Sequence, residues 1–285
     1  MLLKNQPTIT LDPIAGSMGV QISGVDLSRP LDDGVFGEIR QALLDYQVIL
    51  FHDQVLEPEH CEAFATRFGP LVPYPFVKGL PGHPGIFEIR KEPDERRNFG
   101  GNWHTDMSFT ETPPLGTMLY AREVPTRGGD TLLTSLYLAW EMLSDGMKEL
   151  LRDMQAEYSA ALKHAGGRAA VMNSTRFTVE NLDRSEEATF HPIVRTHPET
   201  GRLALYVSGS HLTRFADMTE EESAPLLDYL RTHATRPEFT CRIRYRPGSL
   251  VLWDNRCTQH LALNDYHGER RVMHRLTIGS SDRPH

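Results

Sequence analysis

SLVLWDNRCTQHLALNDYHGERRVMHRLTIG, residues 249–279, contains two short apolar runs separated by polar and turn-forming residues. The first run ends at a turn predicted at Asp254–Asn255, and the second run occupies residues 271–279. Runs rich in β-branched and aromatic residues, bounded by Gly, Asn and Asp, are typical of strands. The stretch therefore predicts strands connected by turns, with His260 shortly after the first strand.

The same strand pattern recurs through most of the chain, at residues 85–90, 116–123, 130–135, 191–197, 203–209 and 239–255. The N-terminal part instead predicts a helix over residues 34–46, a strand at 47–52, and a second helix over 57–69 with Gly69 at its C-terminal cap. Two helical insertions are predicted, at residues 135–154 and at 219–234, where Thr219 and Glu222 fit a capping box. This order of elements predicts an antiparallel barrel or jelly roll decorated by helices.

Length and composition favour one domain over residues 1–285, because 39% hydrophobic residues in a chain of 285 can form a sizeable core. The formal charge of −8 is spread along the chain, which argues against nucleic acid or an anionic membrane surface as the main partner. No run approaches the roughly 18 apolar residues of a membrane span, and the first residues form no apolar signal, so a cytoplasmic protein is expected. Three cysteines without a CxxC pair predict buried thiols.

His104 and Asp106 lie two positions apart in the segment GNWHTDMSFTETPP, residues 101–114. On an extended strand, residues i and i+2 project from one face, so both side chains can offer ligand atoms to one point while Thr105 is directed away. His260 is the candidate third ligand. Two histidines and one carboxylate on one face of an octahedral ion form the site of non-haem Fe(II) oxygenases, with three positions left open.

Two arginines follow in the last predicted strand. Arg271 and Arg275 are four residues apart, so a strand would direct both guanidinium groups to the same side as His260. Buried unpaired cations are costly, and the planar guanidinium matches a carboxylate bidentately, so inward arginines predict bound anions. The alternative is a solvated basic edge that also includes Arg270.

Four ordered motifs resemble those of the taurine and 2,4-dichlorophenoxyacetate dioxygenase family: WHTD at 103–106, GGDT at 128–131, WDNRCTQH at 253–260 and RRVMHR at 270–275. The resemblance implies a mainly β, cupin-like double-stranded β-helix in which His104, Asp106 and His260 hold Fe(II). It also implies that Thr131 and Arg271 bind the distal carboxylate of 2-oxoglutarate, that Arg275 binds the acidic group of the substrate, and that Asp130 is a turn residue. The implied reaction uses O2 to hydroxylate a small anionic organic substrate, with release of succinate and CO2, in a dimer to tetramer.

The substrate pocket departs from that of the taurine enzymes. Tyr74 stands where they carry a sulfonate-binding histidine, Val77 replaces a tyrosine, and Gly100 replaces an asparagine, which together favour a larger or more apolar acid. Candidate pocket residues are Tyr74, Met107, Tyr206 and His211, each of which also has a packing or surface role as its alternative. An insertion around residues 160–188, with His164 and the pair Gly166–Gly167, is predicted to be a mobile lid.

Two other functions stay open from the sequence alone. A jelly-roll protein could bind a small acid without catalysis, because folds are readily reused. A zinc hydrolase could use the same His-Asp-His set, although no nearby general base is evident.

Overall fold

The computed structural model describes residues 9–162, 166–173 and 176–285. The strands are β1 (Thr10–Pro13), β2 (Val20–Ser23), β3 (Val48–Phe51), β4 (Ile86–Lys91), β5 (Gly116–Glu123), β6 (Thr131–Ser135), β7 (Gln155–Ser159), β8 (Ala188–Pro192), β9 (Val194–Thr196), β10 (Leu203–Leu205), β11 (Leu212–Phe215), β12 (Thr240–Ile243), β13 (Leu250–Asp254), β14 (Thr258–Ala262) and β15 (Arg271–Ile278). The helices are α1 (Asp33–Tyr46), α2 (Pro58–Thr66), α3 (Leu136–Glu141), α4 (Asp145–Leu151), α5 (Arg168–Asn173) and α6 (Glu220–Ala234), with short 3-10 turns at Leu182–Glu186 and Pro237–Phe239.

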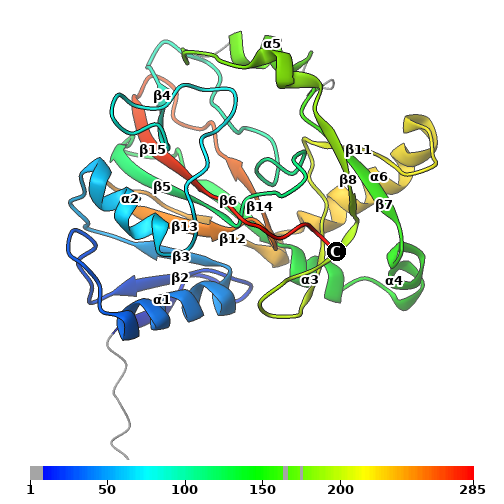
Figure 1. The fold of residues 1–285 in the computed structure, drawn as a ribbon, viewed down its shortest axis with the longest axis horizontal. Coiled ribbons are helices and arrows are strands. Elements are labelled where there is room, and N and C mark those ends of the chain that lie inside the picture. Colours follow the sequence, from blue (N-terminus) through cyan, green and yellow to red (C-terminus); the bar gives the residue numbers. More distant parts are fainter. Residues whose placement is uncertain (1–8, 163–165, 174–175) are drawn as a thin grey trace, which may run out of the picture.

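A seven-stranded sheet in the order β1-β2-β3-β13-β5-β15-β4 forms the main layer (Figure 1). Its pairings are antiparallel except for β2 with β3. The central strands are apolar on both faces, because each face is covered by other elements. Along β13, for example, Leu250 and Leu252 face one way while Val251 and Trp253 face the other.

The outer face of this sheet is covered by α1 and α2 (Figure 1). The helical spacing predicted for residues 34–46 is confirmed, and it buries Ile39, Ala42 and Leu43 against the sheet. In contrast, the prediction that Gly69 caps the second helix is wrong, because α2 ends at Thr66 with Arg67 as its cap. Gly69 is instead a site of close approach, where an added Cβ would lie 2.9 Å from the carbonyl oxygen of Gly279.

The inner face packs against a three-stranded sheet in the order β12-β6-β14. Trp253, Val251 and Met273 from the large sheet meet Leu133 and Cys241 from the smaller one in a shared core. A second core joins the remaining strands, in the sheets β11-β7-β8 and β10-β9, to α3 and α6. The inward side chains of β15 therefore point into the space between two sheets.

Several predicted elements differ in extent from the observed ones. Residues 104–106 form no strand: His104 makes a single β-bridge to His260, and a turn follows. The predicted strand at 203–209 ends at Leu205, and the predicted helix at 135–154 divides into α3 and α4. The capping box of Thr219 and Glu222 is confirmed at the start of α6.

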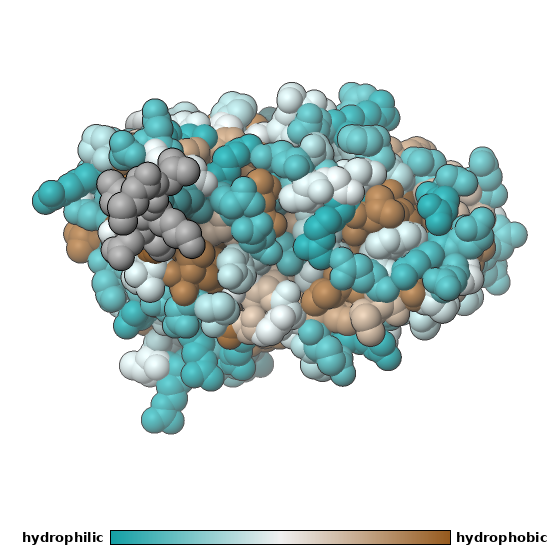
Figure 2. Space-filling model, turned by 90° about the horizontal axis from the view of Figure 1, so that it is seen from below, coloured by the Kyte–Doolittle hydropathy of each residue, from teal (hydrophilic) through white to brown (hydrophobic). Residues whose placement is uncertain are grey.

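The surface is mainly hydrophilic on the face that Figure 2 shows, where hydrophobic residues appear as separate patches. Among the described residues, no helix is both long and apolar enough to cross a membrane. Cys61, Cys241 and Cys257 are free and buried, which confirms the prediction of buried thiols.

Substitution Gly37→Ala in α1 is expected to raise the free energy of unfolding by about 0.8–1.0 kcal/mol, because alanine loses less backbone entropy than glycine in a helix interior. The added Cβ would meet no atom within 4 Å. Gly34→Ala is the control: its Cβ would lie 3.0 Å from Oδ1 of the capping residue Asp32, so the gain should be smaller. Urea unfolding of both variants measures the difference, and an unchanged Gly37→Ala protein would contradict the expectation.

Candidate metal centre and anion-binding cavity

A single β-bridge brings the two candidate histidine ligands together. The backbone N–H of His104 donates to the carbonyl of His260 at 3.0 Å, and the N–H of His260 donates back to His104 at 2.9 Å. The two imidazole rings consequently lie side by side, with centroids 4.1 Å apart. His260 belongs to β14, whereas His104 lies in the loop between β4 and β5.

Asp106 completes a cluster of three potential ligand atoms. Its Oδ1 lies 3.5 Å from Nε2 of His104 and 3.8 Å from Nε2 of His260. All three ligand atoms lie within 4.8 Å of one another, a spacing that suits one small metal ion with ligand bonds of about 2.0–2.2 Å. The structure thus brings together the three residues that the sequence proposed as ligands.

The protonation states of these side chains suit a divalent cation. Nδ1 of His104 lies 2.7 Å from the carbonyl oxygen of Asn102, which can only accept, so Nδ1 carries a proton and Nε2 is the nitrogen available to a metal. Burial, with a contribution from His104, holds the pKa of His260 well below its usual value, so that ring is neutral. Burial opposes ionisation of Asp106, but Arg275 and the two histidines outweigh it and hold the pKa of Asp106 well below 3.8.

A chain of hydrogen bonds fixes the orientation of Asp106. The Thr117 hydroxyl in β5 donates to Oδ2 of Asp106 at 2.7 Å, and it accepts from the Asn255 side-chain amide at 3.0 Å. The indole N–H of Trp253 donates in turn to Oδ1 of Asn255 at 3.0 Å. With Oδ2 held in this way, Oδ1 is left to face the histidines.

The turn between β13 and β14 is held by a buried ion pair. Asp254 accepts from Nη2 of Arg256 at 2.6 Å and from Nε at 2.9 Å, and it lies 3.1 Å from Nε2 of His197. Burial raises the pKa of Asp254, but Arg256 and His197 lower it far more, so the carboxylate is ionised. His197, Asp254 and Cys257 are also close enough to share a metal, but Asp254 already has partners, and burial raises the pKa of the Cys257 thiol. These groups therefore stabilise the hairpin that carries His260.

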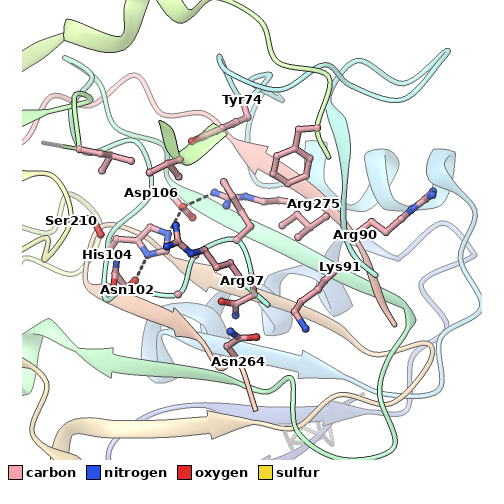
Figure 3. Close-up of a pocket in the computed structure, with 18 of the residues that line it drawn as sticks. Tyr74, Arg90, Lys91, Arg97, Asn102, His104, Asp106, Ser210, Asn264 and Arg275 are labelled. Atoms are coloured by element: carbon pink, nitrogen blue, oxygen red, sulfur yellow. Dashed lines mark hydrogen bonds and ion pairs between the residues drawn. The ribbon is translucent and has the colours of Figure 1, made fainter. Parts of the chain in front are cut away.

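A cavity of about 570 Å³ opens beside the metal cluster (Figure 3). His104 and Asp106 are part of its wall. The only other carboxylate in the described wall is that of Glu95. The basic side chains of the wall are Arg90, Lys91, Arg97, Arg168, Arg271 and Arg275. Six cationic side chains facing two acidic ones favour an anionic ligand.

Arg271 and Arg275 both project from β15 into this cavity, as expected for residues four apart on a strand. Arg271 is 5% exposed, and its Nε and Nη2 have no hydrogen-bond partner among the described residues. Its guanidinium lies 5.3 Å from the ring of Tyr245, whose hydroxyl donates to Oγ1 of Thr131 at 2.9 Å. Thr131 is buried and is not among the described residues that line the cavity. Tyr245 lies between it and Arg271, because it hydrogen-bonds Thr131 and packs against the guanidinium of Arg271.

Close approach of the backbone supports Arg271. Gly129 has a φ of +70°, and an added Cβ would lie 3.1 Å from Cδ of Arg271. Asp130, the next residue, accepts from Nε of Arg242 at 2.6 Å and does not belong to the metal cluster. The GGDT motif therefore packs a turn against the arginine.

Arg275 approaches the metal cluster directly. Its Nη2 lies 2.5 Å from Oδ1 of Asp106 (Figure 3). Its guanidinium lies 5.6 Å from the ring of Tyr74 and 5.5 Å from that of Phe87. On the other side of Tyr74, Arg168 donates from Nη1 to the tyrosine hydroxyl at 3.0 Å. Nη2 of Arg168 is buried and has no partner among the described residues.

The predicted pocket residues separate into two groups. Tyr74, Met107 and His211 are in the cavity wall, but Tyr206 is not, because it is fully buried against Tyr158 beyond the end of β10. Gly100 lies beside His104, where an added Cβ would be 3.4 Å from Cε1 of that histidine. His164 lies outside the described residues.

Sequence reasoning did not identify several residues of this region, among them Lys91, Arg168, Tyr245 and Tyr266. Lys91 is one position beyond the predicted strand 85–90, and Arg168 is in the insertion treated only as a lid. The alternation of Phe87, Ile89 and Lys91 was the one signal available for Lys91, because residues at i, i+2 and i+4 share a face.

Comparisons with known proteins agree with this geometry. The family model described as "Taurine catabolism dioxygenase TauD, TfdA family" matches residues 10–277. An alkylsulfatase from Acinetobacter baylyi is 34% identical over 278 residues, covering 95% of this chain and 84% of the relative. An alpha-ketoglutarate-dependent sulfate ester dioxygenase from Pseudomonas putida is 32% identical over 276 residues, covering 95% and 89%. A crystal structure of a taurine dioxygenase from Burkholderia xenovorans superimposes with a TM-score of 0.81 at 36% identity, covering 98% and 93%.

Thr117→Val should lower the affinity for a divalent metal about 10–100-fold, because it removes the donor that orients Asp106 without changing the side-chain shape. Thr277→Val is the matched control. Thr277 pairs with Thr117 across β15 and β5, but its buried hydroxyl has no partner among the described residues. Titration with Mn(II), followed by the electron paramagnetic resonance signal of the free ion, measures both affinities. Equal affinities for the two variants would show that Thr117 does not position Asp106.

Proposed function

Because this chain belongs to the taurine catabolism dioxygenase TauD, TfdA family, we propose that His104, Asp106 and His260 hold its Fe(II). Enzymes of this family are dioxygenases that use Fe(II), 2-oxoglutarate and O2, and the chain is such an enzyme. The observation that carries the assignment is the convergence of two imidazoles and one ionised carboxylate on one point. Bound iron with its co-substrate supplies the oxidising power for hydroxylation, while succinate and CO2 are released.

The residues around Arg271 are proposed to bind 2-oxoglutarate. Its buried, unpartnered nitrogens match a carboxylate, and the pair Tyr245–Thr131 supports the guanidinium from behind. The keto acid spans from this carboxylate subsite to the metal ligands. The protein contributes by fixing that orientation and by excluding water.

The primary substrate is proposed to be a small organic anion with an apolar body, such as a sulfate ester. Arg275 binds the anionic group, and Arg168, Tyr74 and His211 line the same part of the wall. Ile89, Met107, Leu162, Val171 and Phe177 supply apolar surface for the organic part. The two relatives above are named for sulfate ester chemistry, which favours this class over taurine. Hydroxylation at the carbon that bears the sulfate oxygen would release sulfate and an aldehyde.

The finer structural assignments belong to this proposal as well. The packing of the seven-stranded sheet against β12-β6-β14 supports a double-stranded β-helix, or jelly roll, within a single domain. The insertion at 160–188 contributes Leu162, Arg168, Val171 and Phe177 to the cavity wall, which supports its role as a lid over the substrate.

A cytoplasmic homo-oligomer remains our expectation. The non-catalytic binding protein is disfavoured, because the relatives are enzymes.

Loss of a metal ligand tests the proposal. With Fe(II) and 2-oxoglutarate under anaerobic conditions, the wild type should show a weak visible charge-transfer band, and admission of air should yield succinate. His104→Ala and Asp106→Ala should lose the band and at least 100-fold of the succinate yield (about 2.8 kcal/mol). His267→Ala, at an exposed histidine, should retain both. Succinate production at the wild-type level by both ligand variants would refute the assignment.

The two inward arginines should separate kinetically. Arg271→Ala is expected to raise the KM for 2-oxoglutarate about 10–100-fold, because it removes a charge-assisted contact worth about 1.5–3 kcal/mol. Arg275→Ala should chiefly raise the KM for a medium-chain alkyl sulfate. Arg270→Ala, at the half-buried neighbour paired with Glu92, should change neither. Initial rates with each reactant varied in turn provide the test, and the reverse pattern would exchange the two roles.

A further inference from the structure

We propose that Lys91 is a second cation for the distal carboxylate of 2-oxoglutarate, acting beside Arg271. This assignment rests on the proposed function and adds a residue to its co-substrate site. Lys91 ends β4, the edge strand of the large sheet, and it lines the same cavity as Arg271 and Arg275.

Strand register places Lys91 beside Arg271. In the antiparallel pair β4–β15, Lys91 is the direct partner of Arg271, and Phe87 is the partner of Arg275. Side chains of such partners lie on one face with Cβ atoms about 4.5–5.5 Å apart. Arg275 is four residues farther along β15, about 13 Å at strand spacing. Lys91 therefore belongs to the Arg271 end of the cavity.

The ammonium group of Lys91 is buried without an anion. Lys91 is 3% exposed, and its Nζ has no hydrogen-bond partner among the described residues. Residues 1–8, 163–165 and 174–175, which the structure does not describe, contain no Asp or Glu. Acidic side chains near it in sequence have other partners. Glu92 pairs with Arg270 at 3.3 Å, while Asp94 and Glu95 lie 2.9 Å and 3.6 Å from Arg176.

Two like charges facing each other across a strand pair destabilise the sheet, and a buried cation without a partner adds a desolvation cost. A bound carboxylate removes both penalties. It has about four lone-pair positions for donors, so the fork of Arg271 can take two of them and the point charge of Lys91 another. Lys91 is thus placed where an anion is needed and the protein supplies none.

The surroundings of Lys91 hold its amine in place. Nζ lies 4.3 Å from the ring centroid of Tyr266, which also lines the cavity. Burial raises the pKa of Tyr266, although the nearby Arg271 opposes that rise. In Figure 3 Lys91 and Asn264 lie on the side of the cavity opposite Tyr74. Tyr74 contacts the substrate arginines, so this position separates Lys91 from the proposed substrate anion.

The test compares two keto acids that differ only at the distal end. Calorimetric titration of the Mn(II)-loaded protein measures Kd without turnover for 2-oxoglutarate and for 2-oxovalerate, in which a methyl group replaces the distal carboxylate. Lys91→Met should raise the Kd for 2-oxoglutarate at least tenfold and leave that for 2-oxovalerate within twofold. Lys78→Met, at an exposed lysine outside the cavity wall, is the matched control and should change both by less than threefold. Lys91→Gln provides a second neutral variant if Lys91→Met does not fold.

The outcomes separate this inference from the function it rests on. An unchanged Kd for 2-oxoglutarate in Lys91→Met, or an equal loss for both keto acids, would overturn the role of Lys91 while the function stands. Failure of the wild type to bind either keto acid would instead refute the proposed function. Urea unfolding without ligand adds an independent readout. Lys91→Met should be at least as stable as the wild type, because it removes one of two facing cations, and a marked loss of stability would indicate a structural role.

Discussion

The reciprocal backbone hydrogen bonds between His104 and His260 are the contact on which the site depends. They join residues 156 positions apart (260 − 104), and they position Cα atoms rather than flexible side-chain ends. Once the backbones are paired, both imidazoles leave the bridge on the same side, and Asp106 follows in the next turn of chain. A ligand set assembled in this way needs little side-chain ordering when metal binds, because folding has already supplied it.

Buried polar groups behind the cavity maintain this arrangement. Asp254 and Arg256 form an ion pair at the turn that leads into β14. Asn255, in the same turn, donates to the Thr117 hydroxyl, which in turn donates to Asp106 and fixes its orientation. Charged groups removed from water stabilise a fold only when their hydrogen-bonding groups have partners, and Asp254 and Arg256 meet this condition. The carboxylate of Asp106 is thereby connected to residues that do not line the cavity. The β13–β14 hairpin can therefore fix the orientation of Asp106.

The cavity has two positively charged regions, one around Arg271 and one around Arg275. The chain carries a net charge of −8, yet the residues described in the cavity wall include six basic side chains against two acidic ones. Of the two arginines of β15, Arg271 faces Lys91 and lies near Tyr245, whereas Arg275 lies between Asp106 and Tyr74. A spacing of four residues on a strand thus gives the proposed subsites for 2-oxoglutarate and for the substrate anion one arginine each. The apolar wall near Tyr74 then decides which organic group accompanies the second anion.

The sequence by itself determined the elements whose signal is local or periodic. Alternation along 271–279 predicted that Arg271 and Arg275 share a face, and the motifs identified the family and the three residues proposed as ligands. Residues 104–106 were expected to be a strand but form a bridge and a turn, because a single pairing with His260 replaces a ladder. Lys91 and Arg168 emerged only from the tertiary structure. The position of Lys91 depends on the register between β4 and β15, and that of Arg168 depends on how the insertion packs against Tyr74. Both are fixed by residues far away in the chain, so the spacing of residues within one segment does not reveal them.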